Sequence, residues 1–299
     1  MKGQQQRQTW RVTLLPLARI VLAVLLVGSA VAVTQVLVKL SKSVLSLGGA
    51  APAFYYVAYL ISSVLVAYFV YRTYVRLVEK RAVSELSPSG VPGELGVGML
   101  IGLGLVSAVV GLLWVLGDYR IAGTGAWAAM FVVLANDGAG AFVEEVLLRG
   151  VVFRITEERL GTWISLAISA VLFALLHLAS SNATVVSAVM VGLEGGVLLC
   201  AAYVLTRRLW LAIGLHFAWD FAQDAIFGVS RGAEGFMRAD LTGPALITGG
   251  DFAIEGSILA LVLSLVVSAY LLTRADAKGH IVAPFWRRKP VDPNPPPAE

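Results

Sequence analysis

Long apolar runs separated by short polar or glycine-rich segments make up most of the chain. A helix that crosses a membrane needs about 20 predominantly apolar residues. The pattern predicts eight such helices, over Val12–Val38, Phe54–Val70, Leu95–Leu116, Trp127–Phe153, Trp163–Leu178, Val185–Leu205, Leu209–Phe227 and Ile254–Leu272. The expected fold class is therefore all-α, a polytopic membrane protein with about eight transmembrane helices around a helical bundle.

The composition agrees with a membrane protein. Of 299 residues, 58% are hydrophobic and only 14% are charged, which is too apolar for an ordinary water-soluble domain. The first apolar run exceeds the roughly 7 to 15 residues of a secretory signal core, so we expect it to be a retained helix. Glycines at positions 98, 102, 104 and 111 space the third run, a pattern that favours close helix packing in lipid.

The net charge of +4 does not indicate a nucleic-acid partner, because the basic residues lie between apolar runs and not in one patch. Sorted over eight alternating spans, sixteen of the 23 Lys and Arg residues fall on one side and five on the other, with Arg19 and Arg149 inside spans. The positive-inside rule then places both termini in the cytoplasm of an integral protein of the cell membrane. A single cysteine, Cys200, excludes an intramolecular disulfide.

The stretch FVEEVLLR, residues 142–149, places two acids and an arginine inside an apolar run. Each ionisable group at membrane depth costs roughly 2.5 to 3.5 kcal/mol on insertion scales, so the charged residues of this stretch must have a structural or functional role. On a helix Glu145 and Arg149 are one turn apart and can pair, whereas Glu144 points about 100° away from them. Glu144 is thus the candidate working carboxylate. A structural charge network between helices is the alternative interpretation.

Further polar groups fall in the following spans, namely His177, Glu194, His216, Asp220 and Asp224. His216 and Asp220 are four residues apart and share a helix face. In a nonpolar layer such groups are stable only if they converge on one another or on water, so we expect Glu144, His177 and His216 to meet in one cavity. Glu194 and Asp224 are weaker candidates, each as compatible with a packing or helix-pairing role as with a role in the site.

A carboxylate with two imidazoles can activate water and stabilise an oxyanion, directly or through a divalent metal. This set of groups favours hydrolysis. No serine or cysteine lies beside a base in a recognisable nucleophile motif, which makes acyl-enzyme chemistry the weaker interpretation. The HExxH signature of soluble zinc proteases is also absent from the sequence.

The segments EEVLLR, FALLH and LWLAIGLHFAWDF resemble the motifs EExxxR, FxxxH and HxxxN or HxxxD of the CAAX prenyl protease type II and bacteriocin-processing (CPBP) intramembrane proteases. The resemblance spans about Trp127 to Phe227. It implies a membrane endopeptidase in which Glu144 activates water with His177, while Glu145 and Arg149 support the site. His216 and its partner Asp220 would stabilise the oxyanion. The expected substrate is a membrane-associated protein or peptide, and prenylated CAAX proteins enter only through the family name.

Asp220 departs from the asparagine found in the family's eukaryotic CAAX-processing members. An ionised aspartate cannot donate a hydrogen bond, so Asp220 must be protonated, orient His216 or ligate a cation. Whether the protein binds a cofactor is therefore undecided by the sequence. A divalent metal such as zinc is one alternative, with Glu144, His177, His216 and Asp220 as candidate ligands.

Depth along the membrane poses a separate question. Glu144 and His216 fall in the cytoplasmic half, whereas His177 lies about 15 residues, or roughly 22 Å, into its span. A tilted helix, or a span that begins near Gly161, would reconcile these positions.

We divide the chain into four segments. Residues 1–125 hold the first three helices and a polar linker, 126–230 the protease-like core, 231–283 an extracytoplasmic loop and the last helix, and 284–299 a basic, proline-rich tail that we expect to be disordered. Three function classes remain, with a membrane protease favoured over a noncatalytic immunity or scaffold member of the same family and over a proton- or ion-coupled transporter. No internal repeat of the kind common in transporters is apparent.

Overall fold

The computed structural model describes residues 15–44, 53–180, 182–230 and 235–288. The α-helices in chain order are α2 (Pro16–Val44), α3 (Ala53–Tyr74), α4 (Val91–Leu116), α5 (Trp127–Glu145), α6 (Arg154–His177), α7 (Val185–Val191), α8 (Val197–Thr206), α9 (Trp210–Phe221), α10 (Ala245–Thr248) and α11 (Ile258–Ala277). Short π-helical segments η1 (Val75–Glu79), η2 (Val146–Phe153), η3 (Gly192–Gly196) and η4 (Ala222–Ile226) continue several of them. Two 3₁₀ turns, η5 (Ile254–Gly256) and η6 (Phe285–Arg287), flank the last helix.

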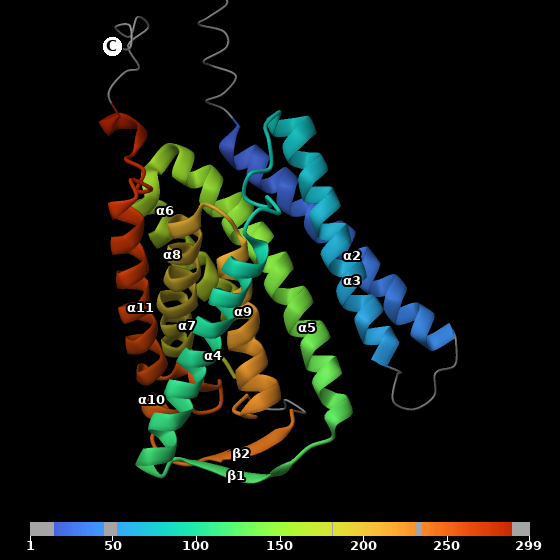
Figure 1. The fold of residues 1–299 in the computed structure, drawn as a ribbon, viewed down its shortest axis with the longest axis vertical. Coiled ribbons are helices and arrows are strands. Elements are labelled where there is room, and N and C mark those ends of the chain that lie inside the picture. The colour runs from blue at the N-terminus through green and yellow to red at the C-terminus, as the bar shows by residue number, and fades with distance from the viewer. Residues whose placement is uncertain (1–14, 45–52, 181, 231–234, 289–299) are drawn as a thin grey trace, which may run out of the picture.

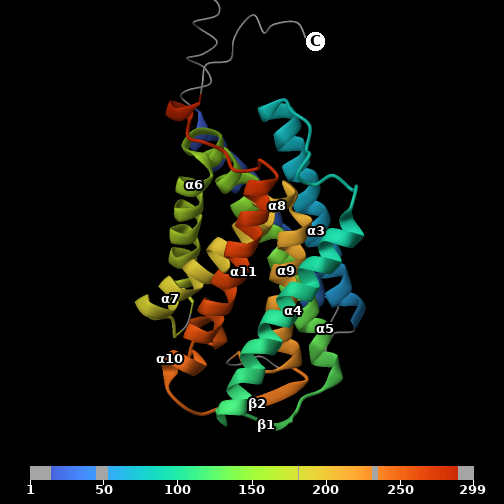
Figure 2. The ribbon, with the colours of Figure 1, turned by 60° about the vertical axis from the view of Figure 1, so that its left-hand side comes forward.

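The helices form a bundle with the α2–α3 hairpin standing on one side of it (Figure 1). The described chain begins and ends at the same end of the bundle, and a two-stranded ribbon closes the other end (Figures 1 and 2). Large apolar side chains remain exposed along the helices, for example Leu17, Leu100 and Val266 at 73%, 71% and 64%. Such surfaces are stable in lipid and not in water.

These features confirm the helical polytopic membrane fold. The count of eight spans is not confirmed, because six helices in the described ranges are long and apolar enough to cross a membrane. Two of the predicted spans lie in one continuous helical stretch, Trp127–His177, which is 51 residues long. The predicted span Leu209–Phe227 is divided between α9, with 12 residues, and η4, with 5.

Gly161 breaks that long helical stretch. Its φ of 76° lies in the left-handed region, which a residue with a Cβ rarely adopts. A Cβ at this position would also meet the backbone of Val282 and Pro284, which crosses close to the glycine. The backbone N–H of Thr162 donates to the carbonyl of Val282 at 2.9 Å, so the segment after α11 is fastened to the break.

The two strands were not predicted. β1 (Tyr119–Thr124) pairs antiparallel with β2 (Met237–Leu241), with an irregularity between Ile121 and Gly123. Both strands are short and come from loops between apolar runs, where strand alternation covers too few residues to be distinguished from an irregular connection. The ribbon ties the loop after α4 to the loop after α9.

Close backbone packing holds α9 against α4. Added side-chain carbons at Gly98 and Gly102 of α4 would collide with the backbone of α9 near Leu215, and one at Gly214 of α9 would collide with Leu95. Small residues at helix interfaces permit this approach in membranes. Two of the four glycines expected at such an interface serve it, whereas Gly104 and Gly111 have no heavy atom within 4 Å of an added carbon.

Arginine–glutamate pairs fasten the end of the bundle at which the described chain begins. Arg19, inside the first span, contacts Glu79 at 2.6 Å and Glu158 at 3.0 Å. Glu79 also receives Arg81 and Arg154, each at 2.7 Å. The α2–α3 hairpin is thereby linked to the start of α6 by charges as well as by apolar contacts.

The predicted tail begins with ordered residues. Phe285–Arg287 form η6, and Arg288 donates to the carbonyl of Glu157 at 3.3 Å. Residues 289–299, on which the rest of the disorder prediction falls, lie outside the described residues.

Candidate active site

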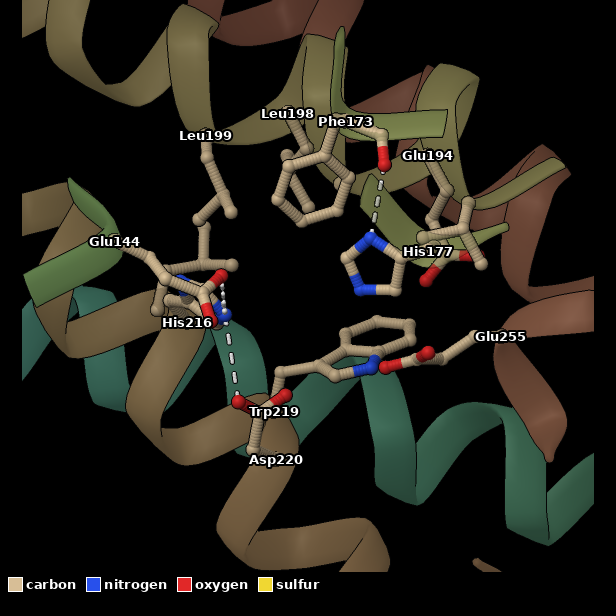
Figure 3. Close-up of a pocket in the computed structure, with 13 residues that line it drawn as sticks. Glu144, Phe173, His177, Glu194, Leu198, Leu199, His216, Trp219, Asp220 and Glu255 are labelled. Carbon is tan, nitrogen blue, oxygen red and sulfur yellow. Dashed lines mark hydrogen bonds and ion pairs between the residues drawn. The ribbon is translucent and has the colours of Figure 1, made fainter. Parts of the chain in front are cut away.

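A cavity of about 100 Å³ lies between α5, α6, η3, α8, α9 and η5. Its polar lining residues are Glu144, His177, Glu194, His216, Asp220 and Glu255. Apolar side chains including Phe173, Leu198 and Trp219 complete the wall. The structure therefore brings Glu144, both membrane histidines and Asp220 together at one cavity, as Figure 3 shows.

Glu145 and Arg149 do not line this cavity but lie behind it. Both side chains are fully buried, and Nη1 of Arg149 is 2.6 Å from Oε1 of Glu145. Nη2 donates to the carbonyl of Gly195 at 3.1 Å, and the guanidinium lies 5.0 Å from the ring centre of Phe173. The pair expected from the helical spacing is thus present and joins α5 and η2 to α6 and η3.

Carboxylates face both nitrogens of the His216 imidazole. Nδ1 lies 2.9 Å from Oε1 of Glu145, and Nε2 lies 3.3 Å from Oδ2 of Asp220. Nε2 is also 4.0 Å from Oε2 of Glu144. Since ionised carboxylates only accept hydrogen bonds, this arrangement is satisfied best by an imidazole that carries a proton on each nitrogen.

His177 presents one ring nitrogen to the cavity. Its Nδ1 lies 2.9 Å from the carbonyl oxygen of Phe173, which can only accept, so Nδ1 must carry a proton. In the neutral ring Nε2 then has a free lone pair. The Phe173 ring lies 4.4 Å from the imidazole centre and packs against its face. His177 is therefore held in one orientation with a basic nitrogen available.

Glu144 is the most accessible of the candidate acids, with 47% of its side chain exposed, whereas Asp220 is 25% exposed. Glu144 and His177 also line a second, apolar groove of about 840 Å³ between α2, α5, η2 and α6. Leu17, Ile20 and Val24 of α2 form its far wall. These two residues thus lie where a groove with lipid-like walls meets the polar cavity.

The two acids left undecided by the sequence have different surroundings. Glu194 lines the cavity and is 3% exposed. Asp224 does not line it and accepts a hydrogen bond from Ser230. The first is available to the site, and the second fastens the loop that follows η4.

Sequence reasoning missed Glu255 and Asp137. Glu255 lines the cavity from η5, just before α11. Asp137 lies on α5 seven residues before Glu144, and its buried Oδ2 has no hydrogen-bond partner. Both positions fall within predicted apolar spans, so the criterion that singled out Glu144 would also have found them.

The sequence left open whether a divalent metal binds at the cavity. Within the described ranges, no group of three or more His, Cys, Asp or Glu side chains is arranged to hold a metal ion. The four candidate ligands line the same cavity without forming such a group.

The helical segment that leads to His177 starts just after Gly161, and His177 is the last residue of α6. His177 and Glu144, from the facing helix, line the same cavity. The break near Gly161 is the one that the second of the two expected solutions requires, and the depth of His177 in the membrane stays a prediction.

Comparison with known families locates the same region. Residues 125–222 match the family model described as type II CAAX prenyl endopeptidase Rce1-like. The match runs from the residue pair before α5 to the first residue after α9 and includes every motif residue named above. It confirms the resemblance to the CAAX prenyl protease type II and CPBP family, and at family level it supports a CAAX-type intramembrane protease. The chain has no match among curated proteins or among solved structures.

Proposed function

We propose that this protein is an intramembrane endopeptidase that hydrolyses peptide bonds of membrane-associated proteins or peptides through a water molecule activated by Glu144 and His177. The observation that carries the proposal is the convergence of Glu144, His177, His216 and Asp220 on one cavity. All four lie within residues 125–222, which match the family model of a type II CAAX prenyl endopeptidase. Because separate charged groups in a nonpolar layer are costly, such convergence favours a catalytic site over scattered packing groups.

Glu144 is the general base in this mechanism. Its exposed carboxylate removes a proton from water, and Nε2 of His177 accepts a hydrogen bond from the same water and orients it. The resulting hydroxide attacks the carbonyl carbon of the substrate's peptide bond. The proton taken by Glu144 then passes to the leaving nitrogen, which balances the hydrolysis.

His216 stabilises the oxyanion. Its Nδ1–H is fixed by Glu145, which Arg149 holds in turn, and its Nε2–H, 3.3 Å from Asp220, is shared between that carboxylate and the oxyanion. A donor that is oriented before the reaction stabilises developing negative charge without reorganisation. Glu145, Arg149 and Asp220 are accordingly positioning residues that act through His216.

The apolar groove supports a substrate that arrives through the lipid. Glu144 and His177 are shared by the groove and the polar cavity, so a chain lying in the groove reaches the activated water without crossing a polar surface. The remainder of the wall is formed mainly by Leu, Ile and Val side chains. We further propose that the termini are cytoplasmic, which the excess of Lys and Arg on that side supports.

The direct test is cleavage by the purified full-length protein in lipid vesicles. A library of membrane-associated peptides is incubated with the protein, and products are identified by mass spectrometry. The proposal predicts new peptide ends that appear only with active protein. Intact peptides throughout, from protein shown to be folded by its thermal unfolding, would contradict it.

A further inference from the structure

The cavity has an acidic end that the proposed mechanism does not use. Figure 3 shows His177 between two sets of acids, with Glu144 and Asp220 on one side and Glu194 and Glu255 on the other. Glu194 comes from η3 and Glu255 from η5. Both line the cavity. We refer to Glu194, Glu255 and Trp219 as the acidic end of the cavity.

A buried acceptor without a donor lies at the acidic end. Glu194 lines the cavity with only 3% of its surface exposed, and its Oε2 has no hydrogen-bond partner. Glu255, which lines the same cavity, accepts a hydrogen bond from the amide of Gln223 at 2.9 Å. Burying an unpaired carboxylate oxygen is costly. Because an ionised carboxylate only accepts hydrogen bonds, the group that satisfies Glu194 must be a donor.

The charges around the cavity indicate that this donor carries a positive charge. No lysine or arginine lines it, whereas four carboxylates do. Arg149 already pairs with Glu145, and His216 is held between Glu145 and Asp220. A cation brought in by the substrate would compensate the charges of Glu194 and Glu255 in a layer where water is scarce.

The walls suit an ammonium group in particular. Trp219 lines the cavity with both acids, and aromatic faces attract cations within about 6 Å of the ring centre. The cavity measures about 100 Å³, and the ammonium of lysine is a compact point charge on a flexible stem that can lie between two carboxylates. A divalent metal fits less well, because the described acids and histidines form no ligand group of three or more.

We propose that the acidic end is a specificity subsite for a lysine side chain of the substrate, with its ammonium between Glu194 and Glu255. The inference rests on the proposed function, since it assigns a preference to the same site. It extends the family's prenylated-substrate description with a requirement carried by this chain's own residues. Glu194 and Glu255 act on substrate binding and not on the activated water.

The test measures binding separately from cleavage. Glu144→Gln protein in lipid nanodiscs is titrated with fluorescent, N-acetylated membrane peptides in which a single lysine is moved along the sequence. Each is paired with a peptide carrying norleucine, which keeps the apolar stem and lacks the ammonium. At one position, the lysine peptide should bind at least about tenfold more tightly, because a site built for a charged donor rejects the analogue without it.

Second substitutions in the Glu144→Gln protein then identify the residues that cause the preference for lysine. Adding Glu194→Gln or Glu255→Gln should reduce the lysine advantage to less than about twofold, whereas adding the matched acid-to-amide change Asp276→Asn, at an exposed position near the end of α11, should leave it intact. Equal binding of lysine and norleucine peptides at every position, or an advantage that survives both cavity substitutions, would overturn the subsite. Failure of the parent protein to cleave any peptide contradicts the proposed function instead, so the two failures are distinguishable.

Discussion

Nδ1 of His216 lies 2.9 Å from Oε1 of Glu145, although the two residues are 71 positions apart in the chain. The same carboxylate oxygen is 2.6 Å from Arg149. One buried glutamate thus fixes an imidazole on α9 and a guanidinium on η2. The second acid of the EExxxR motif therefore positions the site, while the first faces the cavity.

Arg149→Ala should destabilise the fold, because it removes the arginine that pairs with the buried Glu145 carboxylate. We expect the free energy of unfolding to fall by about 3 to 5 kcal/mol, together with the yield of folded protein. Thermal and denaturant unfolding in detergent measure the change. Arg76→Ala, at an exposed position on η1, is the matched control and should change stability by less than about 0.5 kcal/mol. Equal stability of the two variants would refute the buried pair.

Glu85, in the linker before α4, predicts a dependence of stability on pH. Burial alone would raise the pKa of Glu85, but hydrogen bonds from Arg81 and Tyr71 outweigh it and hold the pKa below its ordinary value. Arg81 contributes two contacts, at 2.7 and 2.9 Å. A carboxyl with a depressed folded-state pKa stabilises the protein above its unfolded pKa of about 4.3, and that stability is lost as the pH falls through the folded value.

The unfolding temperature of the parent should therefore fall on acidification below about pH 5 more steeply than that of Glu85→Gln. Thermal unfolding of both proteins across this range measures the difference. Because acids remote from Arg81 titrate equally in the two proteins, the difference between the curves isolates Glu85 and the contacts that it shares with Arg81. Parallel curves would contradict the assignment.

Asp220→Asn should retain cleavage within about tenfold of the parent, because the amide oxygen can accept the same hydrogen bond from Nε2 of His216. Asp220→Ala removes that acceptor and should cost about 10- to 100-fold, as expected for a positioning partner. Initial cleavage rates in vesicles, with and without chelator, provide the comparison. Parent activity that is lost to chelator and restored by one divalent metal, with Asp220→Asn needing more of it, would make Asp220 a ligand instead.

Much of the candidate site could be predicted because its chemistry is local. The i,i+4 spacing defines the Glu145–Arg149 pair and the shared face of His216 and Asp220, and the cost of isolated charges in lipid requires the motifs to converge. Glu255 falls inside a predicted apolar span, so the charge alone could have singled it out, but its place at the cavity could not be predicted, because only the tertiary fold brings the 3₁₀ turn before α11 there.

The fold was also predicted in outline, because hydrophobic length is a local property of the sequence. Hydrophobic length locates membrane helices, but it does not reveal where one helical stretch bends into another, as at Gly161. The sequence places Arg19 inside the first span without indicating a partner, whereas the fold pairs it with Glu79 and Glu158. Both features depend on segments that are far apart in the sequence.

The central claim is that Glu144 activates the water that cleaves the substrate. Its most direct test compares the cleavage rates of the parent and Glu144→Gln in the same lipid vesicles, with equal amounts of protein shown to be folded by thermal unfolding. Glutamine keeps the size of the side chain but cannot accept the proton, so we predict a loss of at least about 10²-fold with an unfolding temperature close to that of the parent. Cleavage by Glu144→Gln at the rate of the parent protein would contradict the claim.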